Sequence, residues 1–114
     1  MPDSGQDLMQ VLSATRRQLN ECLIFYKNVG RKLAEAERLY KLAYRKEVFR
    51  LHIEDGVAWT ACEGLAKGDE TVAKLRMERD MRKSDYDSTY EKILALKAEL
   101  RIIENEISFE RRGM

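Results

Sequence analysis

Residues that interrupt helices are scarce in this sequence. It has one proline, Pro2, and six glycines, of which Gly56, Gly64 and Gly68 fall in one short stretch. Proline and glycine are the residues that break helices most effectively, so their near absence elsewhere removes the usual stop signals. Together with a charged fraction of 36%, this composition is typical of long solvated helices and argues against a turn-rich α/β or all-β domain.

Residues that carry chemistry are equally scarce. The two cysteines, Cys22 and Cys62, are 40 positions apart, and the single histidine is His52. These residues form neither the spacing of a metal site nor a disulfide framework, and the glycines do not form a phosphate-binding loop. Two isolated cysteines suit a reducing cytoplasm. We interpret Cys62 as a small buried side chain rather than a reactive thiol, and His52 as a surface or interface residue rather than a general base. We therefore expect no catalytic residue, no metal and no cofactor.

Long apolar runs and a dominant charge are also lacking. No segment is apolar for the roughly 20 residues that a membrane span requires, and residues 1–7 lack the order of a signal peptide. With 21 basic and 20 acidic side chains the formal net charge is only +1. We expect a soluble cytoplasmic protein, in which any electrostatic recognition is local.

What the sequence does contain is helical periodicity. Apolar or small residues recur at alternating steps of three and four, the rhythm of a helix that buries one narrow seam against another helix. This pattern predicts a helix over residues 6–54, because one glycine, Gly30, costs only about 1 kcal/mol. Two helices broken at residues 28–30 are the alternative. The predicted seam consists of Leu12, Thr15, Leu19, Cys22, Tyr26, Val29, Leu33, Ala36, Tyr40 and Ala43.

A turn and two further helices are predicted after this segment. Asp55-Gly56 is a strong turn signal, and a short apolar helix follows over residues 57–67. Gly68 suits a left-handed residue after it, and Asp69 can cap the next helix. That helix is predicted over residues 70–111, with Arg79 and Arg82 on its seam. The remaining seam residues are Val72, Leu75, Tyr86, Thr89, Ile93, Leu96, Leu100, Ile103 and Ile107.

These elements predict an all-α fold, a single helical domain over residues 1–114. Two helices of 40–50 residues joined by a short connector must fold back as a long antiparallel hairpin that resembles a coiled coil, with the short helix capping the closed end. Each helix of a hairpin meets only one partner and buries little surface. We therefore predict that a homodimer or higher homo-oligomer completes the bundle.

Aromatic residues supply one set of candidate binding residues. Tyr40 and Tyr44 lie one turn apart, as do Tyr86 and Tyr90, and a hairpin turning near residue 62 would bring the two pairs opposite each other. Such a cluster could contact a protein partner or stack on bases, or could simply be a wide core layer. Trp59 is a candidate anchor for a partner, or alternatively seals the turn.

Basic residues supply the other set. Residues 38–50 carry a net +4 and residues 74–83 a net +3, which the hairpin would place side by side, whereas residues 51–73 carry −4. The patch could contact phosphates, or the seam arginines could pair with acids across an oligomer interface. The candidate nucleic-acid-binding residues are Arg38, Lys41, Arg45, Lys46, Arg50, Arg76, Arg79, Arg82 and Lys83.

Three stretches carry a resemblance to known proteins. They are residues 51–56 (Leu-His-Ile-Glu-Asp-Gly), residues 68–76 (Gly-Asp-Glu-Thr-Val-Ala-Lys-Leu-Arg) and residues 97–104 (Lys-Ala-Glu-Leu-Arg-Ile-Ile-Glu). The chain beyond about residue 30 resembles small helical proteins from early gene clusters of phages and prophages of Gram-positive bacteria. Those clusters also encode recombination proteins and inhibitors of host defence, so the resemblance implies a setting and no site residues.

Two functions follow as hypotheses. The first is non-enzymatic protein–protein binding, including inhibition of a host defence nuclease such as a CRISPR effector. The near-zero net charge argues against DNA mimicry and favours inhibition by contact or occlusion. The second is a DNA-binding accessory role in phage recombination or replication, which depends on the basic patch and the tyrosines. A structural coiled-coil spacer in a phage assembly is a third possibility.

Overall fold

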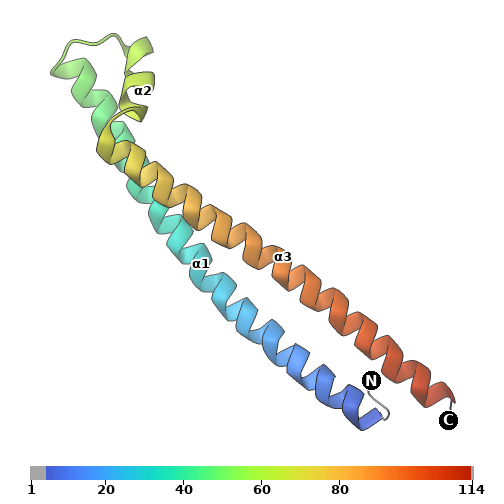
Figure 1. Ribbon diagram of the computed structural model, residues 1–114. Coiled ribbons are helices and arrows are strands. Elements are labelled where there is room, and N and C mark those ends of the chain that lie inside the picture. Colours follow the sequence, from blue (N-terminus) through green and yellow to red (C-terminus); the bar gives the residue numbers. More distant parts are fainter. Residues whose placement is uncertain (1–4, 114) are drawn as a thin grey trace. The chain divides into compact units, whose positions relative to one another are not determined.

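The computed structural model describes residues 5–113 and places almost all of them in three helices (Figure 1). Helix α1 spans Gly5–Ile53, α2 spans Trp59–Lys67 and α3 spans Glu70–Gly113. No residue within 5–113 belongs to a strand. The predicted all-α fold is confirmed: two long helices pack against each other, and a short helix lies between them in the sequence. Pro2 lies outside the described residues.

Helix α1 continues without a break through Gly30, so the alternative of two shorter helices is wrong. The glycine has a packing reason rather than a conformational one. A Cβ built at Gly30 would lie 3.2 Å from Cε1 of Tyr86, which is tighter than an ordinary contact. The missing side chain therefore lets the Tyr86 ring lie directly against the α1 backbone.

The predicted turn after α1 is present. Gly56 adopts a left-handed conformation with φ +69°, which only glycine adopts without strain. The Val57 N–H donates to the carbonyl oxygen of Leu51 over 3.0 Å, and Ala58 is extended with φ −60° and ψ 141°. Helix α2 consequently begins at Trp59, two residues after its expected start.

The junction between α2 and α3 follows the prediction only in part. Gly68 has φ −86° and ψ −7°, so it is right-handed and not the left-handed residue expected. Its N–H donates to the carbonyl oxygen of Leu65, and that of Asp69 to Ala66, both over 3.1 Å. This tight turn provides hydrogen-bond donors for the Leu65 and Ala66 carbonyls in the last turn of α2, and Gly68 needs no positive φ to form it. The Asp69 cap is confirmed, because its Oδ2 accepts the Val72 N–H over 3.1 Å.

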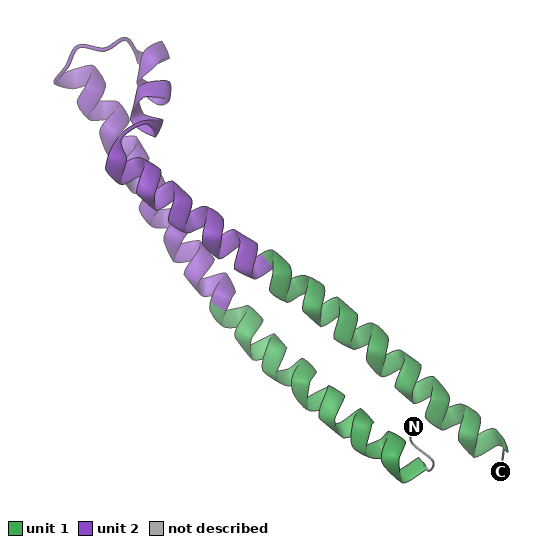
Figure 2. Cartoon of the chain, in the orientation of Figure 1, with its two compact units in different colours: residues 1–28, 87–114 green, residues 29–86 purple. Residues whose placement is uncertain are grey.

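The chain forms two compact units, coloured separately in Figure 2. Unit 1 contains the described residues 5–28 and 87–113, and its core runs antiparallel between α1 and α3. Near the chain ends, Leu8 and Leu12 pack with Ile107, Ile103 and Leu100. Further along, Cys22 packs with Ile93 and Leu96. Residues later in α1 thus pack against residues earlier in α3, as an antiparallel hairpin requires.

Unit 2 contains residues 29–86 and includes α2. Its apolar cluster joins the end of α1 to α2, where Leu51 packs with the fully buried Cys62 and Ala66. The seam between α1 and α3 in this unit is more polar. There the Arg79 guanidinium lies 4.7 Å from the centroid of the Tyr40 ring.

The sequence pattern located both seams. Each predicted seam residue, Arg79 and Arg82 included, is buried or half-buried. The seam arginines pair with acids on their own helix, Arg79 with Asp80 over 2.8 Å and Arg82 with Glu78 over 3.3 Å. These pairs account for the two charges on the seam without an oligomer interface. Assembly into a larger bundle stays a prediction.

Candidate protein-binding surface

Three aromatic side chains meet at the α1–α2 end of unit 2. His52 and Trp59 stack with ring centroids 3.7 Å apart and planes inclined by 20°. Phe49 meets the same indole edge-to-face at 5.5 Å. Because Phe49 and His52 come from the last turns of α1 and Trp59 from the first turn of α2, the cluster depends on the turn between the helices. We call Phe49, His52 and Trp59 the aromatic cluster.

The cluster is held in place from beneath. His52 Nδ1 lies 2.7 Å from the carbonyl oxygen of Val57, and since a carbonyl only accepts, this contact places a proton on Nδ1. The Cys62 thiol approaches the same oxygen at 3.5 Å. One carbonyl of the connecting loop therefore links the ends of both helices, which fixes the ring that Trp59 stacks on.

The rings remain exposed despite these contacts. Trp59 leaves 48% of its surface accessible, and Phe49 and the neighbouring Ile53 are also exposed. Cys62 and Ala66, not Trp59, are the residues buried beneath α2. Trp59 nevertheless packs across the turn on His52 and Phe49, so both roles predicted for it, sealing the turn and anchoring a partner, stay predictions.

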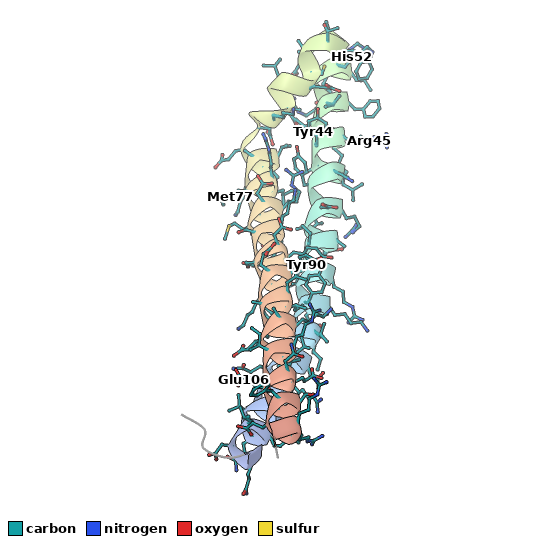
Figure 3. The ribbon with its side chains drawn as sticks, turned by 90° about the vertical axis from the view of Figure 1, so that its right-hand side faces the viewer. Tyr44, Arg45, His52, Met77, Tyr90 and Glu106 are labelled. Atoms are coloured by element: carbon teal, nitrogen blue, oxygen red, sulfur yellow. The ribbon has the colours of Figure 1, made fainter. Side chains whose placement is uncertain are left out.

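A groove adjoins the cluster and shares Phe49 with it. Its volume is about 590 Å³, and Glu63 of α2 lines one side. Figure 3 shows Tyr44, Arg45 and His52 along the same end of α1. Burial raises the pKa of the Tyr44 hydroxyl, and the Glu63 carboxylate adds to this shift. The groove is lined by Lys41, Leu42, Tyr44, Arg45, Val48, Phe49 and Glu63.

The basic residues predicted on α1 divide into paired and unpaired sets. Arg38 binds Glu35 over 2.6 Å, and Arg50 reaches Glu47 over 2.7 Å and Asp55 over 3.1 Å. Hydrogen bonding to Arg50 lowers the pKa of the Glu47 carboxyl and raises that of the guanidinium. Among the described residues, Lys41, Arg45 and Lys46 form no ion pair, and all three are exposed. Of these three residues, Lys41 and Arg45 line the groove.

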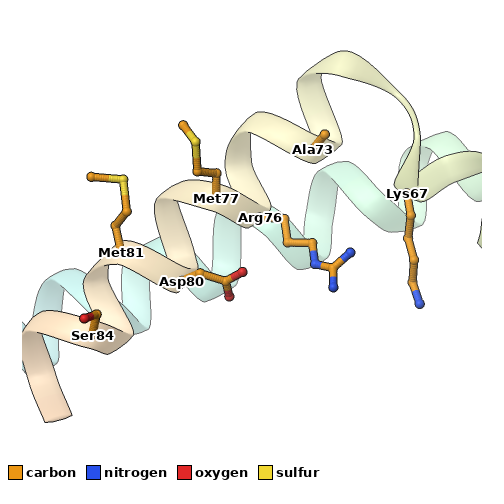
Figure 4. Close-up of a pocket in the computed structure, with 7 residues that line it drawn as sticks. All are labelled: Lys67, Ala73, Arg76, Met77, Asp80, Met81 and Ser84. Carbon is orange, nitrogen blue, oxygen red and sulfur yellow. The ribbon is translucent and has the colours of Figure 1, made fainter.

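The basic residues of α3 are spread more widely. Arg79 and Arg82 are paired on their own helix as described above. Arg76 lines a shallow hollow of about 470 Å³ with Lys67, Met77 and Met81, and Figure 4 shows the two methionines projecting to the opposite side from Arg76 and Lys67. Lys83 is exposed. Asp80 and Ser84, one turn apart on α3, also line this hollow.

The two tyrosine pairs do not face each other as predicted. Tyr90 lies beside Tyr26, with ring centroids 6.0 Å apart, and Tyr86 lies against Gly30. Tyr40 and Tyr44 neighbour each other at 6.0 Å. The predicted four-tyrosine cluster is therefore not formed: Tyr90 is exposed, whereas Tyr40, Tyr44 and Tyr86 are half-buried.

The cause is the pairing of α1 with α2. The end of α1 packs against α2 through Leu51, so α3 pairs only with earlier residues of α1. Because Gly30 lies opposite Tyr86, the hairpin is centred on residue 58, four residues before the turn expected near residue 62. Moving the centre by four residues moves the α3 residue opposite any given α1 residue by eight, or about 12 Å at 1.5 Å per residue.

Sequence reasoning missed Phe49 and the stacking of His52 on Trp59. The signal was available in part, since Leu42 and Phe49 are bulky apolar residues seven positions apart and off the predicted seam. The ring contacts themselves depend on how the turn folds, which spacing alone does not specify.

Two general properties of the described residues bear on function. No group of three or more His, Cys, Asp or Glu side chains within residues 5–113 is arranged to hold a metal ion. In the same range, no helix is both long and apolar enough to cross a membrane. Comparison of the chain with protein-family models, with curated proteins and with solved structures gives no match in any of the three.

Proposed function

We propose that the protein acts without catalysis, by binding another protein through the aromatic cluster and the adjoining groove. The observation that carries this proposal is the Trp59 ring, which is held against His52 and Phe49 yet leaves about half its surface accessible. Tryptophan is among the residues most enriched in binding hot spots. Its ring is already ordered here, so binding would sacrifice little side-chain freedom.

The groove suggests the chemistry of the partner. Its wall is apolar at Leu42, Val48 and Phe49, and its rim carries Lys41 and Arg45 without ion pairs. A partner segment with apolar residues flanked by acidic ones would fill the wall and pair with the rim. Glu63 on the α2 side would favour a cation at that end of the segment.

The resemblance to phage early-gene products adds a partner class to test, a host defence nuclease. A net charge of +1 makes imitation of DNA an unsuitable mode of inhibition. An inhibitor of this composition would instead block a surface of the nuclease by contact. The acidic and apolar segment inferred above is the feature to seek on such a target.

The experiment is comparative capture from a host lysate, followed by binding measurements with the purified partner. Trp59→Ala and Phe49→Ala remove the cluster, and Ile24→Ala removes an exposed apolar side chain from unit 1 as a matched control. Truncating a hot-spot residue costs about 2–4 kcal/mol, equal to about 30- to 900-fold in Kd. We expect the two cluster variants to lose the partner and the control to retain it.

Circular dichroism separates loss of binding from loss of fold. Because Trp59 is half-exposed and at the start of α2, its truncation should leave the helix content of α1 and α3 unchanged. Partner binding that survives both cluster substitutions at unchanged affinity contradicts the proposal.

Single-stranded nucleic acid is the second candidate ligand for the same groove. Tyr44 and Phe49 could stack on bases while Lys41 and Arg45 contact phosphates. Fluorescence anisotropy with labelled DNA at about 50 and about 200 mM salt tests this, because displaced counterions make affinity fall steeply with salt. Micromolar binding with that slope, abolished by the double variant K41E/R45E, favours the DNA-binding role. Absence of binding at low salt removes it.

A further inference from the structure

Helix α3 carries a second row of apolar and small residues in unit 1, separate from the seam that faces α1. The row consists of Ala95, Ala98, Ile102, Asn105 and Phe109, which follow one another at steps of three, four, three and four. All five are exposed, Ile102 by 58% and Phe109 by 78%. The row therefore has the spacing of a coiled-coil seam but no helix packed on it within the described residues.

The row cannot be covered by α1. Successive residues of a helix are about 100° apart, which places the row about 160° around α3 from the buried seam at Ile93, Leu96, Leu100, Ile103 and Ile107. Helix α1 occupies that seam in unit 1. The two faces of α3 point in nearly opposite directions, so α1 leaves the outer row uncovered.

The charges beside the row complement a second copy of the same chain. In a parallel two-stranded coiled coil, a residue on one flank of the seam faces the opposite flank of its partner five residues further on. Within the row, Arg101 would then face Glu106, twice because of the two-fold symmetry. Both residues are exposed, and neither has an ion pair among the described residues. A parallel, in-register pair therefore gains two attractive contacts.

Antiparallel pairing fits less well. The register that pairs Ala98 with Ile102 brings Arg101 against Arg101 and Glu99 against Glu99, and these two repulsive contacts offset the two attractive ones between Lys92 and Glu106. The register that pairs Ala95 with Ala98 gains only contacts between Lys92 and Glu99 and leaves Phe109 without a counterpart in the row. In parallel register, by contrast, Ile102 meets Ile102 and Phe109 meets Phe109, so both bulky apolar residues of the row have an apolar counterpart.

We propose that a second copy of this chain packs in parallel on the outer row of α3, with Ile102 and Phe109 as its main apolar contacts. The residues of this interface belong to unit 1 and those of the aromatic cluster to unit 2. This inference is independent of the proposed function, since loss of the dimer and loss of the partner are measured separately.

Sedimentation equilibrium of the full chain tests the dimer. At about 100 μM, well above a Kd in the micromolar range, we expect twice the 13.3 kDa mass of one chain. The double variant I102E/F109E should sediment as a monomer with unchanged helix content, and Ile24→Glu, an exposed site on α1, should remain a dimer. A monomeric wild type, or a double variant that still dimerises, overturns the proposal.

Cysteine cross-linking tests the orientation. Asn105→Cys places a thiol against its own copy only in the parallel register, so mild oxidation should give a disulfide-linked dimer. Glu104→Cys, one position earlier and on another face of α3, is the matched control and should remain uncross-linked. The native Cys22 and Cys62 are buried and free, so wild type should not cross-link. A dimer by mass in which position 105 does not cross-link contradicts the parallel arrangement.

Discussion

Two adjacent isoleucines of α3 provide the sharpest stability test of the fold. Ile103 is 6% exposed and packs in the core of unit 1, whereas Ile102, about 100° around the helix from it, is 58% exposed. Replacing either by alanine makes the same chemical change and the same change in helix propensity. Any difference between Ile102→Ala and Ile103→Ala therefore measures the difference in burial.

The expected magnitudes follow from that burial. Truncating a buried isoleucine to alanine costs about 2–5 kcal/mol, and we expect about 2–3 kcal/mol for Ile103→Ala because a helix pair relaxes more readily than a large core. Full burial of an isoleucine contributes about 1.5–3 kcal/mol, of which Ile102 realises less than half. The higher helix propensity of alanine offsets part of this loss, so Ile102→Ala should cost about 0.5 kcal/mol or less.

The assay is urea unfolding followed by circular dichroism across a dilution series. At concentrations where the chain is monomeric, Ile103→Ala should lower the transition midpoint markedly while Ile102→Ala barely moves it. At higher concentration, Ile102→Ala should additionally lose the concentration-dependent gain in stability that a dimer confers. Equal losses for the two variants under monomeric conditions would refute the assignment of the two faces.

Three further predictions concern caps, charge and close packing. Asp69→Ala removes the N-cap of α3 and should lower the free energy of unfolding by about 0.5–2 kcal/mol in urea titrations. Arg50 lowers the folded pKa of Glu47. The Glu47 carboxylate therefore contributes its full stabilisation above the unfolded pKa of about 4.3, and this stabilisation is lost as pH falls through the lower folded pKa. Carboxyl NMR titration should show the Glu47 pKa rising in Arg50→Gln. Gly30→Ala should stabilise the protein by less than the usual ~1 kcal/mol, because the added Cβ crowds the Tyr86 ring. In a Tyr86→Ala background the same substitution should stabilise the protein more. An equal gain in the free energy of unfolding in both backgrounds contradicts the contact.

Most of the fold could be predicted from the sequence because it depends on a repeated local signal. The alternation of three and four steps identifies which residue of each turn is buried, and a long helix repeats that signal many times. Seam positions as different as Thr15, Tyr40 and Arg79 were placed correctly because the phase of their neighbours fixes them. The Asp55-Gly56 turn could also be predicted, because a residue with left-handed backbone conformation at that position requires glycine.

Register between the helices was harder to predict because it is set by a few tertiary contacts. Packing of Leu51 on Cys62 and Ala66 assigns the last turns of α1 to α2, which shifts the pairing of α3 and separates the tyrosine pairs. The conformation of Gly68 shows a similar limit, since glycine permits a left-handed residue without requiring it.

The candidate site was predictable only as single residues. Trp59, Lys41 and Arg45 could be selected from their chemistry, but their association with Phe49 and His52 depends on the turn geometry. Several predicted basic residues are matched by acids on the same helix, such as Glu35 and Glu47 three residues before an arginine. That spacing is visible in the sequence and distinguishes the compensated charges from those around the groove.

The central claim is that the aromatic cluster is a protein-binding surface, and affinity for a captured partner tests it most directly. The measurement is isothermal titration of the purified partner with wild type, Trp59→Ala and Ile24→Ala. The account predicts that the Trp59 variant weakens binding by at least about 30-fold, the lower end of hot-spot behaviour, while the Ile24 variant matches wild type. Equal affinity of all three proteins would contradict it and would place the binding surface elsewhere on the chain.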